Sequence, residues 1–225
     1  MARSIFIDTA SISDIKEWKN RLSLSGVTTN QKIFSLQKNI DFKKTVLSIC
    51  KLINVPVSIE LTTHDTLDGM IKEAKKISSW DKNVVIKVPM TIDGTGLTAI
   101  KCLSKLKIKT NATVMVSFEQ MLLAINAGAT YASIFLNRAN DVGYDGLEII
   151  KRSRNFIDYG DYKTQIITGS IRNVRDVGNA FACGSDIVTI PPTILSAMLV
   201  EKKTEETIIE FDKAWEEFKK NNLLK

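Results

Sequence analysis

The stretch NVVIKVPM, residues 83–90, indicates the fold more clearly than any other part of the chain. It is short, apolar and rich in β-branched residues, which is typical of a buried β-strand. An apolar pattern with the 3.6-residue period of a helix precedes it at residues 66–78. The same order of strand and helix recurs along the chain about every 25 residues.

Eight strands can be placed in this way, and helical patterns fill the gaps at, for example, residues 41–53, 66–78, 118–126 and 146–157. Eight strand–helix units in 225 residues predict the α/β class and a single (β/α)8 TIM-barrel domain over residues 1–225, with an additional helix at residues 205–220. The expected strands are residues 4–7, 26–29, 56–61, 83–90, 110–116, 131–136, 164–168 and 186–190.

Composition is that of a globular protein and narrows the classes of partner. Hydrophobic residues make up 44% of the chain and charged residues 25%, which is enough apolar material for a sizeable core. The net charge of +6 comes from lysines scattered among acidic residues, with no basic block interleaved with aromatic residues. This pattern favours phosphorylated small molecules over nucleic acid. No apolar run approaches the roughly 20 residues of a membrane helix, so no membrane partner is expected.

Histidine and cysteine usage excludes several kinds of site. A single histidine, His64, rules out metal sites that need two or three histidines. It also gives little support to a Ser-His-Asp hydrolase, because no GxSxG motif accompanies it. Cys50, Cys102 and Cys183 are dispersed and odd in number, which favours thiols in a reducing compartment. Asp8 comes too early for a signal peptide, and we expect a cytoplasmic protein.

Residues 94–99, GTGLTA, fit the glycine pattern of a dinucleotide-binding turn. Such a site also needs an acidic residue at the end of the next strand, where this chain has Lys109, Thr110 and Asn111. We therefore interpret the glycines as a turn into a helix.

Polar residues gather where a barrel keeps its active site, at the carboxyl ends of the strands. Nearly every expected strand contributes at least one, so we expect these side chains to surround one cavity. They are Asp8, Thr28, Thr29, Asn30, Glu60, Lys87, Asn111, Thr113, Ser133, Arg138, Ser170 and Arg172.

Lys87 is the most informative of them, because it stands inside an otherwise apolar strand. Alternation along the strand puts it on the same face as Val85. If that face points into the barrel, desolvation favours the neutral amine that attack on a carbonyl requires. The alternative is a lysine on an exposed strand face that guards against aggregation. Glu60 and Asn111 are expected to flank it on neighbouring strands, which favours Schiff-base chemistry.

The two acidic residues each allow two interpretations. Glu60 also lies in an apolar strand, where it either forms an ion pair with Lys87 or shuttles protons. Asp8 either caps the following helix or acts as a general acid/base. Ser11 and Ser13 can cap that helix, which leaves Asp8 free for chemistry.

Residues 170–173, SIRN, lie between the seventh expected strand and a helix. Barrels often bind phosphate here, where the amides of a helix N-terminus point at the anion. Arg138 and Arg172 could supply positive charge, and the alternative is that they are surface arginines.

Together these motifs resemble the short transaldolases and the related fructose 6-phosphate aldolases over nearly the whole chain. The resemblance rests on residues 6–10 (FIDTA), 26–30 (GVTTN), 84–91 (VVIKVPMT), 109–113 (KTNAT), 127–129 (AGA) and 170–173 (SIRN). It implies a class I mechanism without metal or other cofactor. It also implies ring-like homo-oligomers, pentamers or decamers, of an enzyme that acts on sugar phosphates.

The resemblance also implies residue roles. Lys87 would form the Schiff base, Asp8 would act on the C4 hydroxyl, and Glu60 with Thr113 would position a water for proton transfer. Asn30 and Asn111 would hydrogen-bond the dihydroxyacetone unit, and Thr29 would also belong to the substrate-binding residues. Ser133 and Phe135 would line the pocket, and Arg138, Ser170 and Arg172 would bind phosphate.

Two positions imply the transaldolase branch of the family. The aldolase branch has glutamine at Glu60 and tyrosine at Phe135, and phenylalanine cannot serve as an acid/base. A transaldolase would pass dihydroxyacetone from fructose 6-phosphate or sedoheptulose 7-phosphate to an aldose phosphate. An aldolase that releases free dihydroxyacetone and a non-catalytic sugar-phosphate-binding barrel remain as alternatives.

The chain departs from the family pattern at a few positions. Gln31 and Lys32 replace a proline and a small hydroxyl residue, which we expect to loosen that turn and to add charge at the cavity mouth. Thr168-Gly169 replaces a usual pair of alanines, and Tyr144 replaces a common histidine.

The expected C-terminal helix has an apolar stripe of its own. Ile208, Phe211, Trp215 and Phe218 are spaced by three, four and three residues, so they share one face. Either this face packs on its own barrel, or it docks on a neighbouring subunit of a homo-oligomer, as the aromatic residues favour.

Overall fold

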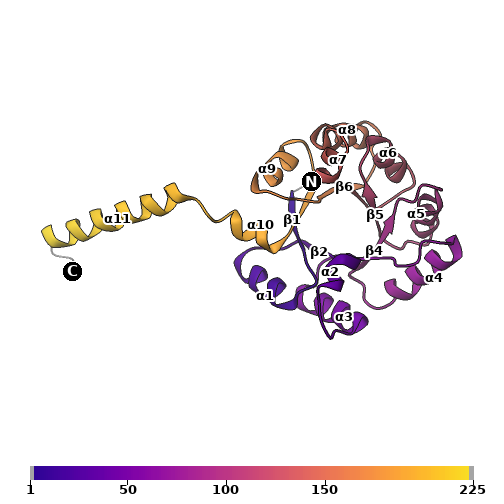
Figure 1. Ribbon diagram of the computed structural model, residues 1–225, viewed down its shortest axis with the longest axis horizontal. Helices are drawn as coiled ribbons and strands as arrows, with labels where there is room; N and C mark the ends of the chain where they lie inside the picture. The colour runs from indigo at the N-terminus through magenta and orange to yellow at the C-terminus, as the bar shows by residue number, and fades with distance from the viewer. Residues whose placement is uncertain (1–2, 223–225) are drawn as a thin grey trace.

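Eight parallel strands close into a barrel in the computed structural model, which describes residues 3–222 (Figure 1). Each strand pairs with its neighbours in sequence, and β1 closes the ring by pairing with β8, where Phe6 lies opposite Thr189. All eight expected strands are confirmed to within two residues at each end. They are β1 (Ser4–Asp8), β2 (Gly26–Thr28), β3 (Val57–Glu60), β4 (Val84–Pro89), β5 (Thr110–Met115), β6 (Tyr131–Phe135), β7 (Gln165–Gly169) and β8 (Ile187–Ile190).

Helices surround the barrel, and two short ones, α2 and α7, were not foreseen from the sequence. Each directly follows a strand and carries one cation to the same end of the barrel, as described below. The helices are α1 (Ile12–Arg21), α2 (Gln31–Ser35), α3 (Phe42–Ile53), α4 (Leu67–Ser78), α5 (Thr95–Lys105), α6 (Phe118–Asn126), α7 (Leu136–Asp141), α8 (Gly146–Tyr159), α9 (Val174–Ala182), α10 (Pro192–Ala197) and α11 (Lys202–Asn221).

The core has two parts. The larger one lies between the sheet and the ring of helices and contains most of the buried apolar residues. The smaller one plugs the barrel interior, where the ring of Phe6 packs edge-on against that of Tyr131 with centroids 6.2 Å apart. Gly26 faces this plug, because a Cβ there would lie 2.4 Å from the ring of Phe6. The plug consists of Phe6, Val85, Tyr131, Ile167 and Ile187.

Strand alternation turns this plug into the floor of a polar cavity. Residues two apart on a strand share a face, so the residue two positions after each plug residue also points inward, one layer higher. Those residues line one cavity, and they are Asp8, Lys87, Ser133, Gly169 and Thr189. The fold therefore places a polar cavity at the carboxyl ends of the strands, where the sequence predicted that these side chains would gather.

The glycines that follow β4 form a turn into a helix, as expected. Gly94 adopts a left-handed conformation at the start of α5, with φ of 80°. Gly96 lies so close to β4 that a Cβ would meet the carbonyl oxygen of Pro89 at 2.0 Å. These glycines serve the strand-to-helix connection, since only glycine fits this close approach.

The C-terminal helix α11 projects away from the barrel (Figure 1). It is longer than expected, and none of its described residues is buried. Its apolar stripe is exposed, with 67% of Phe211 and 53% of Trp215 accessible to solvent. The alternative that this helix packs on its own barrel is therefore wrong for the structure. Residues 1–2 and 223–225 of the expected domain lie outside the described part.

Candidate active site

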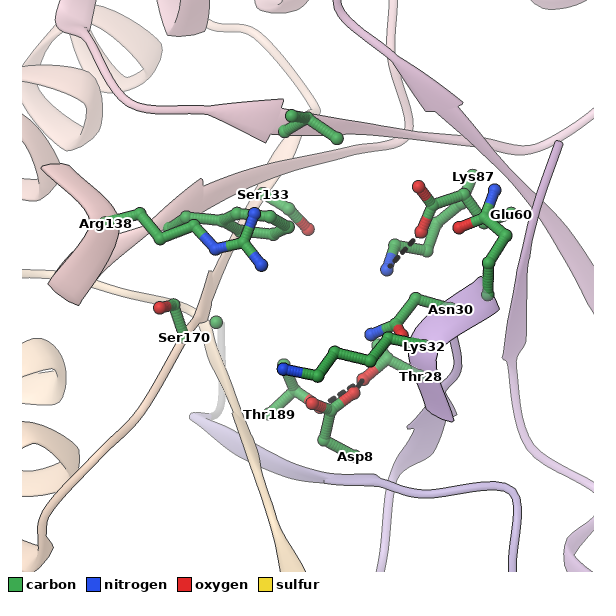
Figure 2. Close-up of a pocket in the computed structure, with 14 residues that line it drawn as sticks. Asp8, Thr28, Asn30, Lys32, Glu60, Lys87, Ser133, Arg138, Ser170 and Thr189 are labelled. Atoms are coloured by element: carbon green, nitrogen blue, oxygen red, sulfur yellow. Dashed lines mark hydrogen bonds and ion pairs between the residues drawn. The ribbon is translucent and has the colours of Figure 1, made fainter. Parts of the chain in front are cut away.

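A cavity of about 260 Å³ opens at the carboxyl ends of the strands (Figure 2). Three cationic side chains and two carboxylates line it, so the charged groups sum to one net positive charge. The cations are Lys32, Lys87 and Arg138, and the carboxylates are those of Asp8 and Glu60. A cavity with a net positive charge suits a substrate that carries negative charge at one end.

Lys87 lies at the bottom of this cavity and is 4% exposed. Its Nζ forms an ion pair with Oε2 of Glu60 at 3.2 Å and donates a hydrogen bond to the carbonyl oxygen of Thr29 at 3.0 Å. The strand register puts Glu60 and Asn111 opposite Lys87 on β3 and β5. Lys87 is therefore an interior residue, and the interpretation as an exposed strand lysine is wrong.

Asp8 ends β1 and faces the same cavity. Its Oδ1 accepts a hydrogen bond from Oγ1 of Thr28 at 2.6 Å. Ser11 caps helix α1 by accepting from the amide of Asp14, so Asp8 is free of that role. Burial raises the pKa of Asp8 above its ordinary value, while Lys87 and the bond from Thr28 act in the opposite direction and Glu60 adds to the rise. A carboxyl group with a raised pKa, close to an amine, is suited to acid/base work.

The turn between β2 and α2 is held by side chains. The Oδ1 of Asn30 caps α2 by accepting from the amide of Ile33 at 2.8 Å. Gln31 donates to the carbonyl oxygen of Leu61 at 2.8 Å and thereby ties the turn to the end of β3. These two contacts hold the turn without a proline at the start of α2. Thr29 points away from the cavity, and its hydroxyl donates to the carbonyl oxygen of Ser58.

Asn111 is buried beneath the cavity rather than lining it. Its Oδ1 accepts from Ser133 at 2.7 Å, and its Nδ2 donates to Oγ of Ser58 at 3.2 Å. Ser133 itself lines the cavity. Thr113 is also fully buried, and its hydroxyl has no hydrogen-bond partner among the described residues. Such a hydroxyl is available to a water or to a substrate group.

A bulge in β5 explains a lining residue that sequence reasoning missed. The register between β5 and β6 shifts between Ala112 and Met115, and Val114 adopts φ of 61°. Simple alternation would turn Val114 outward, but the bulge turns it to the cavity wall. No residue type in this strand signals the irregularity.

The opposite wall carries the groups expected to bind phosphate. Phe135 ends β6, and the guanidinium of Arg138 on α7 lies 5.1 Å from the centre of its ring. Ser170 follows β7 in a left-handed conformation with φ of 59°, and its carbonyl oxygen accepts from Asn137. Figure 2 shows Lys32 and Arg138 extending into the cavity from opposite sides. Neither cation forms an ion pair among residues 3–222.

Arg172 is placed differently from the expectation. It does not line the cavity, and its guanidinium makes a two-pronged ion pair with Asp141 at the surface. The amides expected to hold an anion are also engaged, because those of Arg172 and Asn173 both donate to Asp176. Asp176 forms a capping box with Asn173 at the start of α9. The structure therefore brings Arg138 and Ser170 to the cavity and leaves Arg172 outside it.

Thr189 is a further lining residue that sequence reasoning missed. It stands on β8, two residues after the plug residue Ile187, and so points inward. Its hydroxyl lies 2.5 Å from that of Thr28. The signal was present in the sequence, because Thr189 is the polar residue of the otherwise apolar eighth strand.

Comparisons with known proteins agree with this geometry. The family model of transaldolase/fructose-6-phosphate aldolase matches residues 5–224. The chain belongs to the transaldolase/fructose-6-phosphate aldolase family. Because the match extends from β1 into the C-terminal segment, family membership applies to the barrel and to α11 alike.

Relatives from several organisms cover nearly the whole of this family member. The probable transaldolase of Caldicellulosiruptor saccharolyticus is 43% identical over 97% of this chain and 99% of its own. That of Streptococcus agalactiae serotype V is 41% identical over 96% and 98%, and that of Carboxydothermus hydrogenoformans 39% over 96% and 99%. The solved thiamine phosphate pyrophosphorylase of Pyrococcus furiosus shares the fold alone, with a TM-score of 0.56 and 13% identity over 84% of this chain and 85% of that one.

Two kinds of feature are absent from the described part of this transaldolase-family chain. Residues 3–222 hold no group of three or more histidine, cysteine, aspartate or glutamate side chains placed to bind a metal ion. Within the same range, every helix is too short or too polar to cross a membrane.

Proposed function

We propose that this chain is a transaldolase that forms a Schiff base between Lys87 and the carbonyl carbon of a ketose phosphate. The observation that carries the proposal is the buried amine of Lys87, 3.2 Å from a carboxylate at the floor of an open cavity. Family membership supports the transaldolase activity. The donor is fructose 6-phosphate or sedoheptulose 7-phosphate, and a dihydroxyacetone unit passes to an aldose phosphate.

The first half of the reaction forms the Schiff base. Glu60 takes a proton from the Lys87 ammonium, and the neutral amine attacks C2 of the donor. The carbinolamine then loses its hydroxyl as water, with the proton returned through Glu60. Thr113 carries a free buried hydroxyl and is proposed to hold the water of these transfers.

The second half breaks and remakes a carbon–carbon bond. Asp8 takes the proton of the C4 hydroxyl, the C3–C4 bond breaks, and its electrons move into the iminium to give an enamine. The aldose phosphate leaves with a new carbonyl at C4. An acceptor aldehyde then adds to the enamine, its oxygen takes the proton from Asp8, and hydrolysis frees Lys87.

The phosphate end of the substrate is proposed to lie between Arg138 and Ser170, with Lys32 facing them. Arg138 has no ion-pair partner among the described residues, so its guanidinium is available for an anion. Asn30 and Ser133 line the same cavity and are proposed to hydrogen-bond the dihydroxyacetone unit. Thr29 and Asn111 do not line the cavity and are proposed to act indirectly. Thr29 accepts a hydrogen bond from Lys87 through its carbonyl oxygen, and Asn111 accepts one from Ser133.

An assay with fructose 6-phosphate, with and without erythrose 4-phosphate, tests the function. A transaldolase converts the donor only when the acceptor is present. Release of free dihydroxyacetone without acceptor would identify an aldolase instead. Absence of turnover under both conditions, together with tight sugar-phosphate binding, would identify a non-catalytic barrel.

Borohydride trapping tests the role of Lys87. Reduction in the presence of fructose 6-phosphate should add a sugar mass to the peptide that carries Lys87, and Lys87→Ala should abolish both the adduct and turnover. Lys32 lines the same cavity and is the natural competitor. An adduct on Lys32 alone would overturn the assignment.

The branch within the family is proposed to depend on Phe135, whose ring cannot exchange a proton. Phe135→Tyr should raise the release of free dihydroxyacetone in the absence of acceptor, because it adds a hydroxyl to the cavity wall. Phe135→Leu removes the ring without adding an acid/base and serves as the control. Equal release from both variants would mean that loosened packing, rather than the hydroxyl, is responsible.

Assembly and location complete the proposal. The exposed stripe of α11 supports docking on a second copy of the chain in a ring-like homo-oligomer, a pentamer or decamer. Cys50, Cys102 and Cys183 are all free thiols, which supports a reducing compartment, the cytoplasm.

A further inference from the structure

Three neighbouring strands carry a chain of hydroxyls that ends on Asp8. Asp8 stands on β1, which lies between β2 and β8 in the barrel. Thr28 on β2 donates to Oδ1 of Asp8 at 2.6 Å, and the hydroxyl of Thr189 on β8 lies 2.5 Å from that of Thr28. Both threonines are nearly inaccessible, at 2% and 6% exposed. Figure 2 shows the three side chains grouped together on one side of the cavity.

The charge on Asp8 sets the direction of this chain. An ionised carboxylate only accepts hydrogen bonds, and a hydroxyl has a single proton to donate. Thr28 gives its proton to Asp8, so the contact with Thr189 requires that Thr189 donate to Thr28. Bonds in such a row polarise and strengthen one another. Thr189 therefore acts on Asp8 through Thr28, although it does not touch the carboxylate.

The row holds one carboxylate oxygen and leaves the other free. Among the described residues, no hydrogen bond reaches Oδ2 of Asp8. Asp8 lines the cavity, so a carboxylate held through Oδ1 leaves Oδ2 as the oxygen without a protein donor there. That is the atom that can take a proton from a substrate hydroxyl.

We propose that Thr28 and Thr189 are positioning residues that fix Asp8 through Oδ1 and keep it ionised, so that Oδ2 can accept a substrate proton. The inference deepens the proposed function, because the acid/base role of Asp8 rests on that proposal. The geometry of the row stands independently of which sugar phosphate is bound.

Other charged groups around Asp8 also affect its ionisation. Lys87 on β4 and Glu60 on β3 face it across the cavity, and Lys32 on α2 and Arg138 on α7 line the same space. Burial raises the pKa of Asp8, Lys87 and the bond from Thr28 lower it, and Glu60 raises it. Removal of the hydroxyl row leaves the burial and the charges in place. The pH at which Asp8 ionises should then move upward.

The test compares variants that remove a hydroxyl with variants that keep it. Thr28→Val removes the hydroxyl that contacts Asp8, and Thr189→Val removes the hydroxyl that contacts Thr28. Thr28→Ser and Thr189→Ser keep a hydroxyl donor at each position. Thr168→Val is the matched control, because it deletes a buried threonine hydroxyl, bonded to Ser185 at 2.8 Å, that faces away from the barrel interior. Ionisation of Asp8 is followed by infrared titration of protein labelled with 13C-aspartate, with Asp8→Asn identifying the signal.

The pH at which Asp8 ionises should be highest in Thr28→Val and next highest in Thr189→Val. In Thr168→Val it should equal that of the wild type. The acid limb of the kcat/KM profile should move in the same order, with a severalfold loss at a pH just above the wild-type limb. The serine variants should return toward the wild type in both readouts. If Thr28→Val does not fold, Thr189→Val decides alone, because it lies at the far end of the row.

An unchanged ionisation pH of Asp8 in Thr189→Val would overturn the proposal, as would a shift of the same size in Thr168→Val. The titration needs no substrate, so it does not depend on catalysis. Failure of borohydride trapping at Lys87 would instead count against the proposed function. The two failures are thus distinguishable.

Discussion

At the scale of single residues, the floor of the cavity holds an ion pair that a stable fold does not need. Lys87 and Glu60 are 5% and 10% exposed in their side chains, and each has lost most of its hydration. The attraction within such a buried pair does not always repay the loss of water. Barrels fill this layer equally well with apolar residues. Stability alone therefore does not explain the pair, whereas the proposed proton exchange between Glu60 and the Lys87 amine would.

The buried charge of ionised Asp8 should lower the free energy of unfolding. A carboxyl group whose pKa is raised in the folded state costs no stability at a pH low enough to protonate both states. Its cost begins as the pH rises past the pKa of the unfolded state and is complete above the pKa of the folded state. Asp8→Asn removes the charge, and its amide oxygen can still accept from Thr28. We expect the Tm of this variant to exceed that of the wild type at neutral pH, with a difference that disappears in acid. Thermal melts across a pH series measure it.

Asp212→Asn on the exposed face of α11 is the control for that series, and it should follow the wild-type curve. An Asp8→Asn variant that melts below the wild type at neutral pH would mean that its interactions outweigh its burial.

The two arginines near the cavity should behave differently. Arg138→Ala should raise KM for fructose 6-phosphate by about 10- to 100-fold, as the loss of a charge-assisted bond to phosphate predicts. The same change should alter KM for a non-phosphorylated ketose far less. Arg172→Ala breaks only the surface pair with Asp141 and should leave both values nearly unchanged. Steady-state kinetics on the two substrates provide the measurement.

A larger KM effect from Arg172→Ala than from Arg138→Ala would show that the loop carrying Arg172 rearranges when substrate binds. Equal losses on both substrates would assign the arginine concerned a structural role.

At the scale of the elements, short connections decide which charges reach the cavity. Helices α2 and α7 each have no more than six residues, and each begins within three residues of the end of a strand. A helix that starts so close to a strand keeps its first turns beside the barrel mouth. Lys32 and Arg138 reach the cavity for this reason, whereas Arg172 lies before α9 and its amide donates to Asp176.

Two glycines, Gly96 in the close connection from β4 to α5 and Gly178 inside α9, should respond in opposite ways to replacement by alanine. Gly96→Ala should destabilise the fold by about 1–3 kcal/mol, because its Cβ would clash with the carbonyl oxygen of Pro89. Gly178 lies inside α9, and a Cβ added there would have no atom within 4 Å, so Gly178→Ala should stabilise by about 0.5–1 kcal/mol. Denaturant unfolding measures both.

Because β4 carries Lys87, Gly96→Ala should also reduce borohydride trapping, while Gly178→Ala should not. A stable Gly96→Ala variant with full trapping would mean that the connection can shift without moving the strand.

At the scale of the whole molecule, α11 differs from the other long helices of the described chain because the barrel does not bury it (Figure 1). Trp215 stacks on Phe218 with ring centroids 5.2 Å apart, yet both rings remain about half exposed. Exposed aromatic surface of this kind costs roughly 25 cal/mol per Å² and marks an interaction site. A second copy of the chain is the partner we propose.

Truncation after Glu201 should therefore produce smaller species by light scattering while the circular dichroism of the barrel persists. The reason is that α11 contributes no buried residue to the barrel. Trp215→Glu together with Phe211→Glu should act like the truncation, whereas Glu210→Lys on the polar face should not. A truncated protein of native mass would exclude α11 as the assembly element, and one that unfolds would mean that the helix supports the barrel.

Much of this protein could be read from its sequence because the governing signals are local. Strand and helix periods depend on neighbouring residues, so the eight strands were placed to within two residues. Alternation put Lys87 on the face of Val85, and strand order put Glu60 and Asn111 beside it. A polar residue in an apolar strand is itself a local signal, and it marked the proposed nucleophile and its carboxylate.

What only the tertiary structure decided concerns contacts between distant segments. One example is the bulge between β5 and β6 that turns Val114 inward. Others are the row from Thr189 through Thr28 to Asp8 and the ion pair with Asp141 that holds Arg172 outside the cavity. No local pattern predicts which of several polar groups will meet, because each has alternative partners of similar energy and the barrel geometry selects among them. The sequence thus determined the fold and the residues proposed for the central chemistry, and the closed barrel decided which side chains share the cavity.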